Sequence, residues 1–260
     1  MLRAAGRALR LAMLCLAISL VGGPPRALAT EQPAPRIWMH DALGRLGVLD
    51  LETGAFRKIA VMTEVLTDLA FAPDGRLFGI SFSHLYEVAR DGDLRRIGRH
   101  GVPCGNALEI GPDGVAYAMG CSSDGLYALD LESGDSEQLF GVGFPSSGDL
   151  AWRGGALMLA ARDGASDALV EIDVERGRAT MIGAFGVGRV YGLVTGPGGR
   201  LYAGSGAQYF EVDAFSGRAH LLGAYAKAGF SEIYGWAIET SFEPGLTARR
   251  PPSPQDDDAA

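Results

Sequence analysis

Three polar side chains occupy matching positions in three similar apolar segments of the sequence. Asp68 lies in TDLAF (residues 67–71), Asn106 in GNALE (105–109) and Asp149 in GDLAW (148–152). Carboxylate and amide oxygens are the ligands that Ca²⁺ and other hard divalent cations take in proteins. If these segments converge, the three residues predict a metal site. The same residue types also hold turns and bond nearby backbone amides, so a purely structural role is the alternative.

Two further copies of this segment carry a tyrosine instead. Tyr191 begins YGLVT (191–195) and Tyr234 begins YGWAI (234–238). A tyrosine ring can stack on a small ligand, and its hydroxyl can hydrogen-bond one. We therefore predict that Tyr191 and Tyr234 contact a ligand near the polar cluster.

Other catalytic signatures are missing from the sequence. The four histidines, at positions 40, 84, 100 and 220, form no HxH or HExxH motif, so surface or strand-pairing roles are expected for them. There is no GxSxG nucleophile turn, and the glycine-rich turns precede strands rather than the helices that bind phosphate. The residues thus favour binding over catalysis.

A repeat of about 40 residues positions these candidate residues. Five apolar segments each contain a turn glycine followed five residues later by Ile or Leu, and these glycines are Gly54, Gly92, Gly134, Gly177 and Gly217. Their successive differences are 38, 42, 43 and 40 residues. Between them lie hairpins turned by Pro-Asp-Gly or Gly-Gly, which supply the positive φ of tight turns. Units of four short strands at this period are typical of a β-propeller.

The arithmetic of the repeat predicts how the ring closes. Residues 36–240 number 205, which is five units of 41. The last unit holds one strand, residues 232–240, so segments 37–40, 45–49 and 56–61 must complete its blade. We expect an all-β, five-bladed β-propeller with four antiparallel strands per blade. An irregular β-sandwich is the alternative, but it does not predict a constant repeat.

Two cysteines flank one predicted hairpin. Cys104 and Cys121 lie nine residues before and eight after Asp113, so they fall nearly opposite on adjacent strands. Directly opposed residues there are close enough for a disulfide. We predict a Cys104–Cys121 disulfide, with a metal thiolate pair or a redox couple as the alternatives.

The two ends are expected to lie outside the propeller. Residues 1–29 begin with three arginines, at positions 3, 7 and 10, followed by a short apolar run and Ala27-Leu28-Ala29, which is typical of a secretory signal peptide; an uncleaved single-span anchor is the alternative. Residues 30–35 are a short linker, and residues 241–260 are expected to be a disordered tail. The protein is therefore expected to be periplasmic or secreted.

Charge narrows the range of partners. Removal of residues 1–29 leaves 19 basic and 31 acidic side chains, a net charge of −12. Such a surface repels nucleic acid and anionic lipid, which bind basic patches. No membrane span is expected after cleavage, and a monomer is expected.

The repeats resemble those of bacterial secreted propellers. Segments PDGRL (73–77) and LYALDLESG (126–134) are similar to the repeats of the gluconolactonase/regucalcin-like, NHL and YVTN groups. The gluconolactonase resemblance implies a divalent cation on the channel axis, with Asn106 matching the family's asparagine and Asp149 or Asp68 its aspartate. No acidic residue matches that family's N-terminal glutamate, and the family has six blades.

Three functions follow as hypotheses. The first is an exported, non-catalytic propeller that binds a small ligand or an envelope protein at one end of its channel. The second is a metal-dependent hydrolase of a lactone or ester, in which a cation held by Asp68, Asn106 and Asp149 polarises a carbonyl and activates water. The third is a scaffold for an envelope complex.

Overall fold

A computed structural model describes residues 36–239, apart from residues 52, 226–229 and 231. The predicted signal peptide (1–29), linker (30–35) and tail (241–260) lie outside the described residues. No helix among the described residues is long and apolar enough to cross a membrane.

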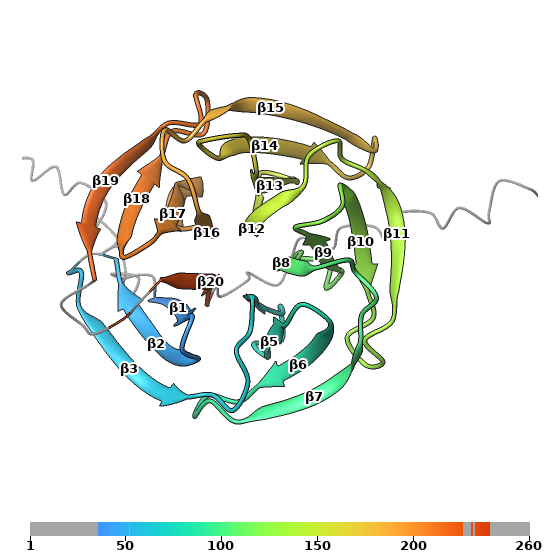
Figure 1. Ribbon diagram of the computed structural model, residues 1–260, viewed down its shortest axis with the longest axis vertical. Helices are drawn as coiled ribbons and strands as arrows, with labels where there is room; N and C mark the ends of the chain where they lie inside the picture. Colours follow the sequence, from blue (N-terminus) through green and yellow to red (C-terminus); the bar gives the residue numbers. More distant parts are fainter. Residues whose placement is uncertain (1–35, 52, 226–229, 231, 240–260) are drawn as a thin grey trace, which may run out of the picture. The chain divides into compact units, whose positions relative to one another are not determined.

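Five four-stranded antiparallel sheets stand around a central axis as the blades of a propeller (Figure 1). Blades 2 to 5 each use consecutive strands, running from the axis outward. Blade 2 consists of β4(Asp68–Phe71), β5(Leu77–Ile80), β6(His84–Val88) and β7(Leu94–Arg99), and blade 3 of β8(Gly105–Ile110), β9(Ala116–Gly120), β10(Gly125–Leu129) and β11(Ser136–Gly141). Blade 4 consists of β12(Ser146–Arg153), β13(Ala156–Ala161), β14(Ala168–Asp173) and β15(Arg178–Ala184), and blade 5 of β16(Val190–Thr195), β17(Leu201–Ser205), β18(Gln208–Val212) and β19(Ala219–Ala224). The predicted five-bladed architecture is confirmed.

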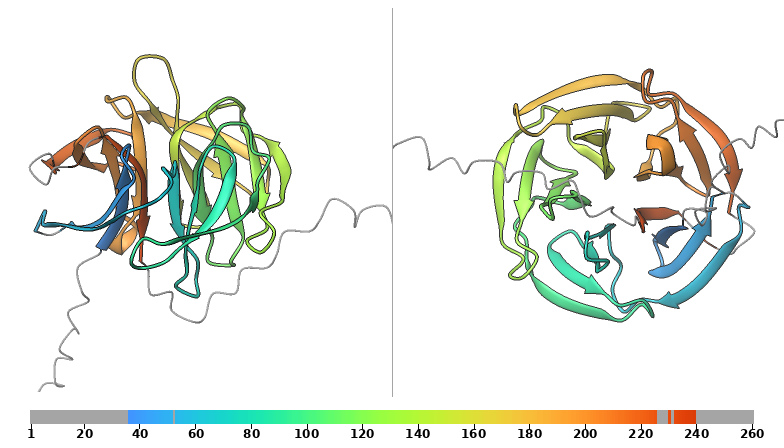
Figure 2. Two further views of the ribbon diagram at one scale, coloured as in Figure 1. Left: turned by 60° about the horizontal axis from the view of Figure 1, so that its bottom comes forward. Right: turned by 180° about the vertical axis from the view of Figure 1, so that it is seen from behind.

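Blade 1 joins the two ends of the described chain. Its inner strand is β20(Ile233–Ile238), which pairs antiparallel with β1(Arg36–Asp41). β2(Arg45–Asp50) and β3(Phe56–Val61) complete the sheet in the order β20-β1-β2-β3. The predicted closure is therefore confirmed, and the reverse view shows the same ring (Figure 2).

The hydrophobic core lies between neighbouring blades. Each of the five interfaces holds one cluster of buried side chains; the cluster between blades 1 and 2, for example, packs Trp38 and Leu46 against Leu69 and Leu77. The inner strands are buried, whereas the outer strands expose about every second or third residue. Each blade thus depends on both neighbours for its core. This packing fixes the positions of the five inner strands along the central axis.

The repeated turn glycines are explained by two constraints. All five have positive φ, between 58° and 93°. Several also touch the outer strand of the preceding blade: a Cβ on Gly134 would lie 2.9 Å from the Cα of Gly98, and a Cβ on Gly217 would lie 2.4 Å from the carbonyl oxygen of Gly183. Glycine at this position allows the turn and lets neighbouring blades approach closely.

A substitution at one such turn should separate these two effects. We expect Gly134→Ala to lower the free energy of unfolding by about 3 kcal/mol, because it adds a backbone clash to the left-handed φ. Gly75→Ala is the matched control, since Gly75 has φ +85° but no atom within 4 Å of its Cβ position; about 1 kcal/mol is expected there. Urea unfolding measures both, and equal losses would contradict the close approach.

Candidate functional site

A pocket of about 150 Å³ opens at one mouth of the central channel. Its inner wall takes one residue from each blade, at or directly before the start of the inner strand: Thr67, Asn106, Gly148, Tyr191 and Tyr234. Strand pairing places these five at equivalent positions in their blades. The residues that follow them form a second ring, one layer deeper in the channel: Asp68, Ala107, Asp149, Gly192 and Gly235. Three residues predicted from the sequence, Asn106, Tyr191 and Tyr234, therefore lie together in one pocket.

The predicted common register of Asp68, Asn106 and Asp149 is wrong by one residue for Asn106. Asp68 pairs with Ile80 and Asp149 with Ala160, but the equivalent pair in blade 3 is Ala107 with Met119. Asn106 thus lies one residue nearer the mouth, level with Thr67. The two aspartates occupy the layer below and do not line the pocket.

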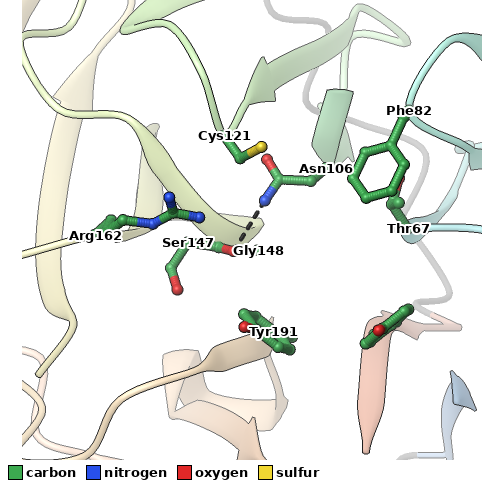
Figure 3. A pocket seen from close by; sticks show the side chains of 9 residues that line it. Thr67, Phe82, Asn106, Cys121, Ser147, Gly148, Arg162 and Tyr191 are labelled. Atoms are coloured by element: carbon green, nitrogen blue, oxygen red, sulfur yellow. Dashed lines mark hydrogen bonds between the residues drawn. The ribbon is translucent and has the colours of Figure 1, made fainter. Parts of the chain in front are cut away.

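The rim of the pocket comes from the turns between the second and third strands of three blades. The rim residues are Phe82, Cys121 and Arg162. Each lies two residues after the second-strand residue that pairs with Asp68 or its equivalent in that blade, so the three are structurally equivalent. Figure 3 shows Arg162 and Phe82 on opposite sides of the pocket, with Asn106 and Cys121 between them. The rim is therefore cationic at one side and aromatic at the other.

Several polar groups of the pocket are already engaged within the protein. The Thr67 hydroxyl donates to the carbonyl of Gly105 at 2.8 Å, and the Ser147 hydroxyl donates to Asp167 Oδ2 at 2.6 Å. Asn106 Nδ2 donates to the carbonyl of Ser147 at 2.9 Å (Figure 3). The bonds of Thr67 and Asn106 join neighbouring blades, the bond of Ser147 lies within blade 4, and together they fix the shape of the pocket.

Three other side chains of the pocket have hydrogen-bond donors that no group among the described residues uses. Within the described part of the chain, the hydroxyls of Tyr191 and Tyr234 and the guanidinium of Arg162 are in no hydrogen bond or ion pair. The tyrosine rings meet edge to face, with centroids 5.9 Å apart. Burial raises the pKa of Tyr191, so its phenol stays protonated at neutral pH and can donate. The arrangement combines aromatic surface with unused hydrogen-bond donors.

Beneath the pocket, Asp68 and Asp149 clamp neighbouring blades. The oxygens of Asp68 accept from the main-chain N–H of Leu69 at 2.8 Å and of Leu108, in the next blade, at 2.6 Å. Asp149 does the same with Leu150 at 2.7 Å and with Leu193, in the next blade, at 2.5 Å. Both aspartates are fully buried. All four carboxylate oxygens are thus in use.

These two carboxyl groups interact with each other as well. Burial, and then the neighbouring Asp149 carboxylate, hold the pKa of Asp68 well above its usual range. Burial likewise raises the pKa of Asp149. Two acids close together in a buried place hold a proton between them at pH values where exposed acids are ionised.

The arrangement does not suit a divalent cation well. The carboxylate oxygens already accept N–H donors, and Asn106 lies in a different layer. Among the described residues no three His, Cys, Asp or Glu side chains come together as a metal-binding group. Calcium binding by Asp68, Asn106 and Asp149 stays a prediction, and the geometry favours their structural role.

The Cys104–Cys121 disulfide is confirmed. The two Cα atoms are 5.3 Å apart, and the N–H of Cys121 donates to the carbonyl of Cys104 at 2.9 Å. Cys104 has φ +55° and stands two residues before Asn106, while Cys121 lies on the pocket rim. The bridge therefore fixes one side of the pocket mouth.

Loss of this bridge should be measurable in stability. The cysteines are 17 residues apart, and closing a loop of this length stabilises a fold by about 3 kcal/mol. We expect Cys104→Ser/Cys121→Ser to lose about this amount in urea unfolding. The wild type treated with a reductant should match the variant, and an oxidised wild type no more stable than the variant would contradict the expectation.

Two titratable groups with large pKa shifts were not found from the sequence. His40, assigned to a surface or strand-pairing role, does pair with Gly235 but is fully buried, which lowers its pKa to about 4. Glu109 accepts the N–H of Trp152, in the next blade, at 2.8 Å, and burial raises its pKa to about 8. Both belong to the packing around the channel, and neither lines the pocket.

The comparisons with known proteins support the fold alone. No protein-family model matches the chain, and no curated protein matches it with significant similarity. A chain in the crystal structure of a nidogen/laminin complex has a TM-score of 0.57 at 12% identity, over 80% of this chain and 99% of that chain. A protein of unknown function from Bacteroides caccae has a TM-score of 0.48 at 13% identity, over 74% and 73%. At 12% identity the likeness to the chain of the nidogen/laminin complex extends to the propeller fold and not to a ligand.

Proposed function

We propose that this chain is a non-catalytic binding protein that holds a small molecule in the pocket at the mouth of its propeller. The observation that carries the proposal is the construction of the pocket. Each blade contributes one residue to its inner wall, two of them tyrosines with unused hydroxyls, and Arg162 adds unused donors at the rim. Concave sites with aromatic walls and a few convergent polar groups are where proteins bind small ligands.

The size of the pocket supports a small molecule over a protein partner. A cavity of about 150 Å³ can hold benzene. A stable protein interface covers about 800 Å² on each partner, far more than this pocket offers. We therefore propose a ligand with about one ring.

An extracytoplasmic location accords with this role. The disulfide at the pocket mouth would persist in an oxidising compartment and not in a reducing one. We propose that the protein works in the periplasm or outside the cell, as its N-terminal residues predict.

The hydrolase suggested by the gluconolactonase resemblance is the competing hypothesis. It needs a metal to polarise a carbonyl, and the two aspartates are engaged by main-chain donors. Calcium titration followed by calorimetry, with lactone turnover assayed alongside, separates the two. Metal-dependent turnover would favour the hydrolase over the binding protein.

A screen of single-ring fragments with acidic, neutral and basic substituents tests the proposed function. We expect some fragments to bind the wild type in ligand-observed NMR and to lose about fivefold in affinity with Tyr191→Ala, since a ring contact contributes about 1 kcal/mol. Phe215→Ala is the control, because Phe215 is 90% exposed in the turn between β18 and β19, at the other end of blade 5. The proposal fails if no fragment binds, or if Tyr191→Ala leaves every affinity unchanged.

A further inference from the structure

The lining of the pocket carries a positive charge in an otherwise acidic protein. The whole chain has 31 acidic and 23 basic side chains. Of the nine residues that line the pocket, Arg162 is the one with a charged side chain, and none is acidic. Its guanidinium is unpaired among the described residues, so the charge is free to meet a ligand.

Two carboxylates near Tyr191 of the pocket already have donors within the protein. Asp167 Oδ2 accepts from the Ser147 hydroxyl at 2.6 Å and from the N–H of Val190 at 2.7 Å. Glu232 pairs with Arg189 at 3.0 Å. Because each has its own donor within the protein, neither is needed to neutralise Arg162.

The layer of residues below the pocket also carries less negative charge than two ionised aspartates would give it. Asp68 and Asp149 are buried and close together, and their raised pKa values keep a proton on the pair. Main-chain N–H groups also point at their oxygens. An anion above them therefore meets less repulsion than two full charges would produce.

The pocket differs from one side to the other. Arg162 and Phe82 face each other across it, with Tyr191 along a third side (Figure 3). A guanidinium matches a carboxylate with two parallel hydrogen bonds, and an aromatic side chain favours an apolar ring. A ligand that satisfies both has a carboxylate at one end and a ring at the other.

We propose that the pocket takes a small single-ring carboxylate, with its carboxylate on Arg162 and its ring against Phe82 and the tyrosines. This inference rests on the proposed function and names its ligand class. The hydroxyls of Tyr191 and Tyr234 supply further donors to the carboxylate or to a polar substituent on the ring.

Three probes of nearly the same shape and different charge test the inference: benzoate, benzamide and benzamidine. Affinities are measured by NMR titration at low salt for the wild type, Arg162→Gln and Arg162→Lys. We expect benzoate to bind at least tenfold more tightly than benzamide, and benzamidine to bind most weakly. Arg162→Gln should cost benzoate about tenfold and leave benzamide unchanged, because a charge-assisted pair is lost. Arg162→Lys should recover part of the loss, since the charge returns without the two-pronged geometry.

A matched variant controls for a general change of charge. Arg57 is exposed on the outer strand β3, and Arg57→Gln removes the same charge far from the pocket. Benzoate affinity should be unaffected. An equal loss in Arg57→Gln and Arg162→Gln would overturn the inference, because long-range attraction alone would then account for it.

The remaining outcomes separate this inference from the proposed function. If benzamide or benzamidine binds as tightly as benzoate, and Tyr191→Ala weakens that binding, the pocket is a ligand site but not one for carboxylates. If none of the three probes binds, the ligand class is wrong, and the wider fragment screen decides whether the pocket binds small molecules at all. If benzoate binds and Arg162→Gln has no effect, the carboxylate does not lie on Arg162 and the inference fails.

Discussion

Asp149→Ala should lower the free energy of unfolding by about 3 kcal/mol. The substitution leaves the main-chain N–H groups of Leu150 and Leu193 buried without an acceptor, and it opens a space beside the channel. An unsatisfied buried donor costs about 1–3 kcal/mol, and the lost bonds include one between two blades. Part of the cost is offset because Asp68 no longer faces a second acid. Urea unfolding followed by circular dichroism measures the difference.

Asp213→Ala is the matched control for this prediction. Asp213 also accepts two main-chain N–H groups, from Phe215 at 2.8 Å and Ser216 at 3.2 Å, but in an exposed turn where water can replace the carboxylate. A loss of about 1 kcal/mol is expected there. Similar losses in the two variants would show that the buried clamp between blades adds nothing beyond an ordinary turn.

Glu109 should lower the stability of the protein as the pH rises from about 5 to 8. Its pKa is raised from about 4.5 to about 8 in the folded state, so the folded protein binds a proton that the unfolded chain has released. The favourable contribution is complete below the unfolded pKa and is lost as the pH approaches the folded one. The slope for one such group is at most about 1.4 kcal/mol per pH unit, or on the order of 4 kcal/mol over this range.

Glu109→Gln isolates this contribution. The amide oxygen can still accept the N–H of Trp152, but the side chain no longer titrates. We expect the variant to lose much less stability than the wild type between pH 5 and 8. His40 acts in the opposite direction between about pH 5 and 6.5, because its lowered pKa leaves the folded protein with fewer bound protons than the unfolded chain, and it does so equally in both proteins. Glu137→Gln, at an exposed position on β11, is the control and should follow the wild type. A wild type and Glu109→Gln with the same slope would contradict the prediction.

The fold could be predicted because its constraints repeat along the chain. Positive φ and close blade contact both require glycine at one turn of every unit, and Gly134 and Gly217 show both constraints. The closure followed from counting, since a unit with one strand at the end must borrow three from the beginning. The disulfide followed from hairpin geometry, because Cys104 and Cys121 flank a short turn.

The site could be predicted only in part, since it depends on register. Matching segments by their polar residue aligned Asn106 with Asp68, whereas counting back six residues from Pro112 and from Pro73 aligns Asn106 with Thr67. One residue of register decides which layer a side chain joins.

The rim was missed for a different reason. The turn that carries Arg162 is adjacent to the start of an inner strand only in space, and the repeat marks it with no constant residue. The equivalent positions in the two preceding blades hold Phe82 and Cys121. The propeller topology would have placed this turn at the channel mouth where the inner strands begin, because the turn between the second and third strands of each blade lies at that end.

A crystal structure of the protein soaked with benzoate tests the central claim most directly. We predict density for one ring inside the pocket at the channel mouth, with its carboxylate within hydrogen-bond distance of Arg162 and its ring beside Phe82. Ligand density at another place on the propeller, or an empty pocket under conditions where benzoate binds in solution, would contradict the account.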